Sequence, residues 1–242
     1  MTRRRFIADA WTATSATLTG DQATHLARVL RAEPGQVYDV VAGGFLHRAE
    51  IASVSPSEVS FILHEELESD TALPLHLLLA VFKFDHMEWA IEKATELGVA
   101  RITPILARRT EKHLAQASAK RVDRWRRIAL EASKQSRRTD IPKIAEPTAL
   151  KLALEQEQSP ARILLSETEQ ATTLSAALTN SIRPTDYESV ALAIGPEGGW
   201  TSEEMALFTA QNWHSVTLGP RILRAETAVI AAVAILGAHL NQ

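Results

Sequence analysis

The sequence contains no cysteine, which excludes disulfide bonds, thiolate metal ligands and a cysteine nucleophile. It also lacks a long hydrophobic run, because the most apolar stretch, Ala228 to Leu240, is shorter than the ~20 residues that a membrane-spanning helix needs. The basic start Arg3-Arg4-Arg5 is followed by polar residues, whereas a secretion signal would continue with an apolar segment. We therefore expect a soluble cytoplasmic protein without a membrane partner.

Several well-known ligand-binding motifs are absent as well. Neither G-x-G-x-x-G nor G-x-x-x-x-G-K-[ST] occurs, so dinucleotide loops and phosphate loops of those types are excluded. The 8 histidines show no metal-ligand spacing such as H-E-x-x-H, and no Ser-His-Asp arrangement can be assembled. We expect no metal ion in the protein.

What is present divides the 242 residues into two parts. Up to about residue 73 the chain consists of short strands and turns, with a hairpin signal at Ala42-Gly43-Gly44 between two β-type segments. From residue 74 onward, continuous apolar runs alternate with amphipathic helices, as strands buried on both faces of a parallel sheet require. The pattern predicts a β-rich domain over 1–73 and an α/β domain over 74–242.

The predicted α/β domain contains five apolar runs and two marked helices. The runs are Leu75–Phe82, Ile102–Leu106, Ile163–Leu165, Val190–Ile194 and Val216–Leu218. Asp85 and Glu88 form a capping-box pattern at the start of the first helix, and Gly98 lies where its carboxyl end needs a left-handed residue. The second helix is predicted over residues 119–134.

Two glycine-containing loops follow the last strands. Gly195-Pro196-Glu197-Gly198-Gly199 ends one apolar run, and Thr201 with Glu204 is typical of the cap of a following helix. The segment from Leu218 to Thr227 ends the last run in the same way. Because ligands of open α/β sheets bind beyond the carboxyl ends of the strands, the two loops predict one small-molecule site. The alternatives are a plain strand-to-helix turn for the first loop, and mutual pairing of Arg221, Arg224 and Glu226 for the second.

A block of positive charge lies between Arg101 and Lys143, which bound a segment of 13 basic and 4 acidic residues. Such a block fits a polyanionic partner. A solvated helical face with internal ion pairs explains the same charges. The arginines of Gln135-Ser136-Arg137-Arg138 offer planar donor groups suited to a phosphate or a uracil edge.

Taken in order and spacing, these segments resemble the RsmE family of 16S ribosomal RNA uridine N3-methyltransferases, within the SPOUT superfamily. The resemblance covers nearly the whole chain. The matching segments are Arg4-Arg5-Phe6, His25 to Arg31, Lys93 to Val99, Ile102-Thr103-Pro104, Glu131, Gln135-Ser136, Arg138, Pro142, Gly195 to Gly199, Leu218-Gly219 and Ile222 to Ala228.

The resemblance implies a fold, a reaction and partners. The fold is α/β, with a SPOUT-type parallel sheet and a C-terminal trefoil knot, preceded by a small PUA-like β-barrel that binds RNA. The reaction is S-adenosylmethionine-dependent methylation of N3 of a uridine, uridine 1498 in the family's target. The partners are 16S ribosomal RNA or the small ribosomal subunit and a second copy of the chain, with the cofactor pocket near the subunit interface. The apolar helix from Ala225 to Leu240 fits such a homodimer, because a helix without a polar face must be covered.

The resemblance also assigns residues. Arg138 is the candidate for electrostatic stabilisation, and Glu197 is the candidate for cofactor contact or proton acceptance. The cofactor-binding candidates are Leu165, Ile194, Gly195, Glu197, Gly199, Leu218, Gly219, Ile222, Leu223, Arg224, Ala225 and Thr227. The RNA-binding candidates are Arg4, Arg28, Arg31, Arg124, Arg127, Lys134, Arg137 and Arg138.

Three positions depart from the family pattern, which usually has glycine at Phe84, arginine at His86 and glycine at Arg137. They bear on RNA docking, while the cofactor segments are intact. Two other functions fit the sequence: a non-catalytic RNA-binding factor of ribosome assembly, and a SPOUT methyltransferase acting on another RNA.

Overall fold

The computed structural model describes residues 5–69, 72–180 and 188–240 and divides into two compact units. The first unit is Met1–Thr71 with Ser133–Asp140, and the second is Ala72–Ala132 with Ile141–Gln242. The sequence places the boundary after residue 73, whereas Leu73 already begins a strand of the second unit. The predicted first domain also lacks Ser133–Asp140, because contacts between segments so far apart leave no local sequence pattern.

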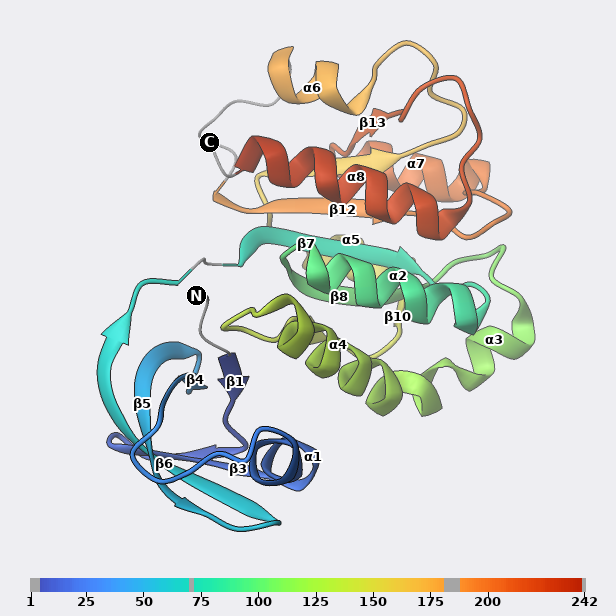
Figure 1. Cartoon of the computed structure of the whole chain (residues 1–242). Helices are drawn as coiled ribbons and strands as arrows, with labels where there is room; N and C mark the ends of the chain where they lie inside the picture. The colour runs from blue at the N-terminus through green and yellow to red at the C-terminus, as the bar shows by residue number, and fades with distance from the viewer. Residues whose placement is uncertain (1–4, 70–71, 181–187, 241–242) are drawn as a thin grey trace. The chain divides into compact units, whose positions relative to one another are not determined.

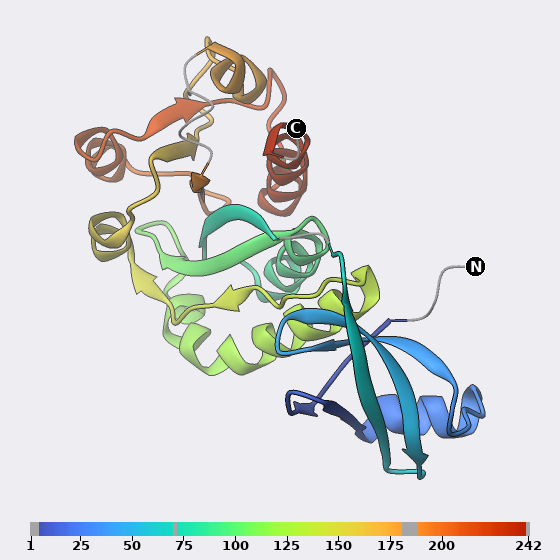
Figure 2. The same cartoon turned by 90° about the vertical axis from the view of Figure 1, so that its left-hand side faces the viewer.

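The first unit contains a curled six-stranded sheet in the order β1-β4-β5-β6-β3-β2, blue to cyan in Figure 2. Its strands are β1 (Arg5–Ile7), β2 (Ala10–Trp11), β3 (Ser15–Thr19), β4 (Val37–Ala42), β5 (Phe45–Val54) and β6 (Glu58–Leu67). The pairs are antiparallel except β1 with β4, which is parallel. The predicted hairpin is confirmed: Gly43 and Gly44 have φ of 63° and 90°, as a two-residue turn between twisted strands requires.

A short helical segment, which the sequence pattern does not predict, completes the first unit. It consists of α1 (Gly20–Thr24) and the π-helical turn η1 (His25–Val29). Ala23 and Leu26 from this segment are fully buried in a core with Leu18, Val40 and Phe61. The expectation of strands and turns alone is therefore wrong here; a helix of this length buries too few residues to show a 3.6-residue period.

The second unit contains a seven-stranded sheet, and every pair of its strands is parallel. The order is β10-β8-β7-β12-β11-β13, and β9 also pairs with β8. The strands are β7 (Leu73–Ala80), β8 (Val99–Leu106), β9 (Lys143–Ile144), β10 (Thr148–Ala149), β11 (Ala161–Leu165), β12 (Val190–Ile194) and β13 (His214–Val216). The predicted parallel sheet is confirmed, and the two short strands β9 and β10 were not predicted.

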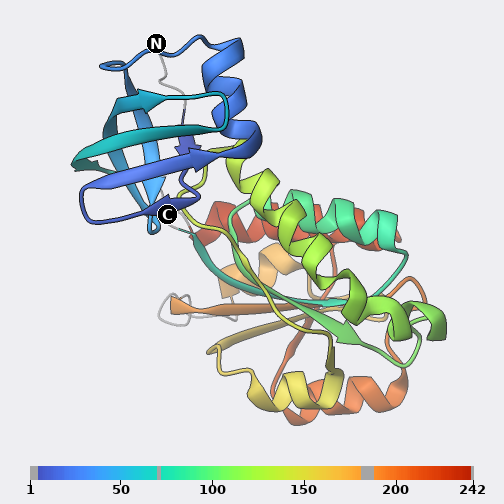
Figure 3. The same cartoon turned by 90° about the horizontal axis from the view of Figure 1, so that it is seen from below.

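Helices cover both faces of this sheet (Figures 1 and 3). They are α2 (Phe84–Glu96), α3 (Lys112–Ala117), the 3-10 turn η2 (Ser118–Arg121), α4 (Val122–Ser136), α5 (Leu150–Gln156), α6 (Leu174–Asn180), α7 (Ser202–Ala210) and α8 (Ala225–Leu240). The alternation of side chains along β7 explains the two layers. Leu75 and Leu77 belong to one core with residues of α2, α4, α6 and α8, whereas Leu78 packs with residues of α5 and α7.

The helix ends test the predicted caps. Thr201 and Glu204 form the predicted capping box of α7. The capping box predicted at Asp85 and Glu88 is wrong, because α2 starts at Phe84 and its cap residue, Lys83, makes no side-chain cap bond. Gly98 follows α2 with a φ of 98°, which confirms its left-handed conformation.

The fold is thus mixed α/β, with a parallel sheet in one unit and a separate curled, mostly antiparallel sheet in the other. The trefoil knot and the PUA-like barrel stay predictions. Within the described residues, no helix has the length and apolar character that crossing a membrane demands.

Candidate functional site

A large cavity lies in the second unit at the carboxyl ends of three adjacent strands, β12, β11 and β13. Its volume is about 920 Å³. Three loops surround it, one after each strand. The lining consists of Arg109, residues 165–170, Thr173, residues 194–200, Met205, residues 217–225 and Ala228. This is the edge of a parallel sheet where ligand sites of open α/β folds are found.

The loop after β12 needs its glycines for two different reasons. Gly199 has a φ of 69°, and its N–H donates to the carbonyl of Pro196 at 2.8 Å, which closes the turn. At Gly195 an added Cβ would lie 3.1 Å from the indole ring of Trp200, and at Gly198 it would lie 3.3 Å from the side chain of Arg109. The turn therefore brings bare backbone to the cavity wall, where a ligand can approach it closely.

The loop after β13 carries its own left-handed residue, Gly219, with a φ of 113°. The Thr217 hydroxyl accepts a hydrogen bond from the Gly219 N–H at 3.2 Å and thereby holds the start of the loop. Ile222 is 84% exposed, the highest value among the large hydrophobic side chains of the described residues. α8 begins directly after this loop, at Ala225.

Two parts of the cavity wall are not predicted from the sequence. One is the loop after β11, where the Glu169 carboxylate accepts hydrogen bonds from the N–H groups of Ala171 at 2.8 Å and Thr172 at 3.0 Å. These backbone bonds lower the pKa of Glu169. The other is Arg109, whose Nη1 donates to the carbonyl of Gly198 at 2.6 Å. The same rule about strand ends would have found the β11 loop, but Arg109 leaves no such signal.

The structure gathers nearly all predicted cofactor residues around this one cavity. Thr227 is the exception, since it is exposed on α8 and is not part of the lining. The predicted residues that line the cavity are Leu165, Ile194, Gly195, Glu197, Gly199, Leu218, Gly219, Ile222, Leu223, Arg224 and Ala225. Glu197 is exposed at the cavity, and the Lys83 N–H lies 3.5 Å from its Oε1.

Arg138, the candidate for electrostatic stabilisation, belongs to the first unit and does not line the cavity. Its guanidinium forms an ion pair with Asp140, and its side chain is only 8% exposed. Sequence spacing could not show this pairing. A role for Arg138 in RNA contact stays a prediction.

The other RNA-binding candidates differ in exposure and in the contacts that their side chains make. Arg28, Arg31 and Arg127 are exposed. Arg124 is already engaged, because its Nε and Nη2 donate to the two carboxylate oxygens of Glu88 at 2.6 and 2.7 Å, a pairing that raises the pKa of Arg124. Lys134 and Arg137 line a small pocket of the first unit. Arg4 lies outside the described residues.

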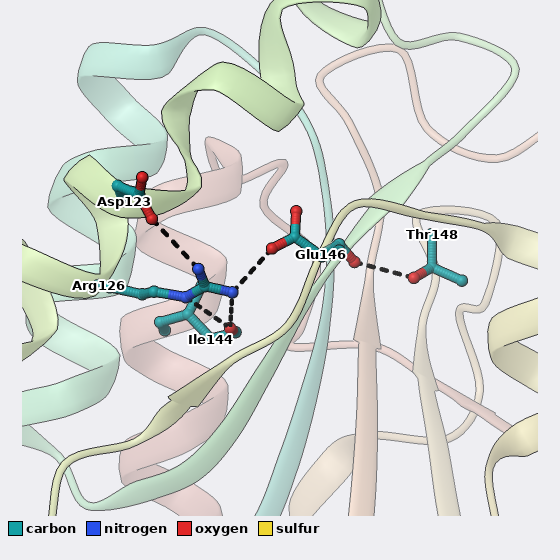
Figure 4. Close-up of polar contacts among 5 residues, drawn as sticks. All are labelled: Asp123, Arg126, Ile144, Glu146 and Thr148. Atoms are coloured by element: carbon teal, nitrogen blue, oxygen red, sulfur yellow. Dashed lines mark hydrogen bonds and ion pairs between the residues drawn. The ribbon is translucent and has the colours of Figure 1, made fainter.

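Part of the basic block holds the fold together, as Figure 4 shows for Arg126. Its guanidinium contacts Asp123 Oδ1 at 3.2 Å, Glu146 Oε1 at 2.8 Å and the carbonyl of Ile144. Thr148 extends the chain of contacts, because its hydroxyl donates to the carbonyl of Glu146 at 2.9 Å. These bonds fasten the segment with β9 and β10 to α4. Arg124 and Arg126 are therefore engaged in ion pairs, as the alternative supposes, but their main partners, Glu88 and Glu146, lie on other segments and not at i,i+4 on the same helix.

Two of the family departures have structural explanations within the second unit. Phe84 packs edge-to-face on Trp125, and the guanidinium of Arg121 lies 4.7 Å from its ring centre. His86 Nδ1 lies 2.8 Å from Oε1 of Glu226, a residue that is only 3% exposed. Arginine at this position would supply a cation to the same carboxylate.

Comparison with known proteins places the second unit in a class. Residues 69–237, which contain the whole parallel sheet and all three cavity loops, match the family described as an RNA methyltransferase domain. Among the described residues, no group of three or more His, Asp or Glu side chains could hold a metal ion.

The full chain belongs to the ribosomal RNA small subunit methyltransferase E family. It is 35% identical over 229 residues to that protein from Synechocystis sp., an alignment that covers 93% of this chain and 74% of the relative. With the Bacillus subtilis protein of the same name it shares 32% identity over 227 residues, covering 90% and 88%.

Solved structures agree along both units. The ribosomal RNA small subunit methyltransferase E of Neisseria gonorrhoeae, bound to S-adenosyl methionine, has a TM-score of 0.82 at 28% identity and covers 98% of each chain. A Legionella pneumophila methyltransferase in complex with S-adenosyl methionine has a TM-score of 0.80 at 30% identity, again over 98% of each chain.

Proposed function

We propose that this protein methylates small-subunit ribosomal RNA with S-adenosylmethionine, at N3 of a uridine in the 16S molecule. The observation that carries the proposal is the single cavity that gathers the Gly195–Gly199 turn and the Gly219 loop at the carboxyl edge of the parallel sheet. The names of the relatives and the cofactor in two similar structures support it.

The residues present fit that cofactor. A volume of about 920 Å³ lies within the ~300–1,000 Å³ of small-molecule pockets. Leu165, Leu218 and Leu223 give the wall an apolar part, and at Gly195 and Gly198 an added Cβ would lie only 3.1 and 3.3 Å from the side chains of Trp200 and Arg109. The bound cofactor would supply an electrophilic methyl group on a sulfonium.

The remaining chemistry falls to the chain. Uridine N3 carries a proton at neutral pH, which must leave as the N–C bond forms and the S–C bond breaks. Glu197 is the candidate acceptor, because its carboxylate is exposed at the cavity. Arg138 is the candidate for stabilising negative charge on the base. Holding the two reactants in line is the other contribution, of up to about 7–11 kcal/mol.

The first experiment titrates S-adenosylmethionine by calorimetry into the wild type and Gly199→Trp. We expect at least a 100-fold loss of affinity, because the indole would fill the cavity. Gly35→Trp is the matched control: Gly35 also has a positive φ, 87°, but lies in the first unit and has open space around its Cβ position. Unchanged affinity in Gly199→Trp would exclude this cavity as the cofactor site.

A second arm of the same experiment separates cofactor binding from transfer. Arg138→Ala should slow methyl transfer to ribosomal RNA and leave the affinity for S-adenosylmethionine unchanged. Equal loss of both would show that Arg138 maintains the fold. Mass mapping of ribosomal RNA from a deletion strain then identifies the nucleotide; a fully methylated 16S uridine in that strain would contradict the proposed target.

A further inference from the structure

A buried carboxylate lies directly behind one wall of the large cavity. The side chain of Glu226 is only 4% exposed, and it belongs to the first turn of α8. Its neighbours on that helix, Ala225 and Ala228, line the cavity, and so does Arg224 just before the helix. A displacement of Glu226 would therefore move this part of the cavity wall with it.

The Glu226 carboxylate is held from another helix. Nδ1 of His86, in the first turn of α2, lies 2.8 Å from Glu226 Oε1. The other ring nitrogen, Nε2, lies 3.6 Å from Oδ2 of Asp85, whose side chain is 78% exposed. Met87 of α2 and Val229 of α8, which follow these polar residues along the two helices, are fully buried in one apolar core. The imidazole thus has one carboxylate on each side.

The positive charges that α4 and the turn before it bring to α2 are used elsewhere. Arg121 and Arg124 both pair with Glu88, at 3.7 and 2.6 Å. The imidazole of His86 is 33% exposed, so it can exchange its proton with the solvent. The charge opposite Glu226 is therefore set by the protonation of His86.

The strength of the contact depends on that protonation. An imidazole gains and loses a proton close to neutral pH. As a cation it has an N–H on both nitrogens and attracts both carboxylates, whereas the neutral ring has a single N–H to donate. The cation adds an ion pair to the hydrogen bond, at a place where a buried carboxylate is costly unless it is paired. The contact is therefore strongest at low pH and weakens as the pH rises through neutrality.

We propose that His86 is a positioning residue for the cofactor site. Through Glu226 it holds the first turn of α8, and with it the loop of residues 217–225, in the shape that binds the cofactor. It is not a catalytic residue, because it does not line the cavity. The proposal rests on the proposed function for the identity of the ligand. It adds a pH dependence: the affinity for S-adenosylmethionine falls as the pH rises and His86 loses its charge.

The test replaces the titrating cation by a permanent one. His86→Arg supplies a guanidinium that stays charged at every pH used, and His86→Asn keeps an N–H donor without a charge. Calorimetry measures the binding of S-adenosylmethionine to the full chain at about pH 6 and about pH 8, on either side of the imidazole range. The wild type should match His86→Arg at the lower pH and bind roughly 3- to 10-fold more weakly than it at the higher pH. His86→Asn should bind more weakly than His86→Arg at both.

The ratio of the two affinities removes pH effects that come from the cofactor or from other side chains. His64→Arg is the matched control, because His64 also contacts a glutamate, Glu50, at 3.5 Å, but is 41% exposed and lies in the first unit. It should keep the wild-type affinity at both pH values. A ratio between His86→Arg and wild type that is the same at both pH values would overturn the inference, because a role in stability alone leaves the affinity of the folded protein unchanged.

Methyl transfer to ribosomal RNA separates this inference from the proposed function. A wild type that binds the cofactor and methylates the RNA, with a ratio that does not change with pH, contradicts only the role of His86. A wild type that fails to bind S-adenosylmethionine at either pH contradicts both.

Discussion

Glu157 shows how burial and hydrogen bonding act together on one carboxyl group. It is 8% exposed, and it follows α5. Burial alone would raise its pKa, but bonds from His76 at 2.5 Å and from Ser159 outweigh burial and lower the pKa from 4.5 to about 2. His76 is held from its other side, because its Nε2 lies 2.8 Å from the Thr103 hydroxyl.

The shift predicts a pH dependence of stability. A carboxyl group with a lowered folded-state pKa stabilises the fold at pH values above 4.5, and this stabilisation is lost as the pH falls from 4.5 towards about 2. At about 1.4 kcal/mol per pKa unit, the effect is at most about 3–4 kcal/mol. Glu157→Gln should therefore unfold more easily than the wild type at pH 7, with a difference that shrinks at pH 3.

Denaturant unfolding at both pH values measures this difference. Glu155→Gln is the control, because its carboxylate lies two residues away, is 49% exposed and has only a 3.9 Å contact with Lys151. If the loss of unfolding free energy caused by Glu157→Gln is the same at pH 7 and pH 3, the pH dependence does not come from the Glu157 carboxyl.

Arg137 shows what a single departure from the family pattern means for the backbone. The family pattern has glycine at this position, and glycine takes a positive φ freely. The structure places Arg137 at a φ of 60°, so arginine adopts the conformation that favours glycine. The strain, about 1–2 kcal/mol, accompanies a side chain that lines the pocket of the first unit.

Among the elements, α2 and α8 share a polar contact between His86 and Glu226. The contact ties the first turn of α2 to the first turn of α8, directly after the cavity loop that contains Gly219. His86→Ala would leave a buried carboxylate without this partner, at a loss of about 1–3 kcal/mol in the free energy of unfolding. His86→Arg should restore most of it.

The comparison variant on the same helix is Lys93→Ala, which removes partly exposed ion pairs with Glu92 and Glu96. It should change stability by less than about 1 kcal/mol. Urea unfolding gives the free energy of unfolding of all three variants. If His86→Ala loses no more stability than Lys93→Ala, the buried carboxylate of Glu226 does not need His86 as a partner.

The strands and loops of the second unit differ in how well the sequence predicts them. The five apolar runs predicted the parallel sheet because strands covered on both faces need no polar side, as in Leu75–Phe82. Strand order and the two-residue strands β9 and β10 escaped prediction, because they depend on pairing between distant segments. The two glycine-containing loops that line the cavity were predicted from local glycine patterns. Arg109 and Arg138 could not be placed, because their partners are set by tertiary packing.

At the scale of the whole molecule, α8 leaves a face that lacks charge. Ala234 is exposed, and Ile230, Ala231 and Ile235 are half-buried beside it. Helices with no polar side are normally covered. We propose that a second copy of the chain covers this face through a two-fold interface, in which the same residues of both copies meet.

The proposed homodimer predicts a specific response to charge on this face. Ala234→Glu would place a carboxylate from each copy at the shared surface, so that desolvation and repulsion oppose association. Sedimentation at micromolar concentration should give twice the monomer mass for the wild type and the monomer mass for the variant. Ala176→Glu, on an exposed position of α6, should stay dimeric. A monomeric wild type would exclude the dimer, and a dimeric Ala234→Glu would place the interface elsewhere, because a buried pair of unpartnered carboxylates is not tolerated at the centre of an apolar contact.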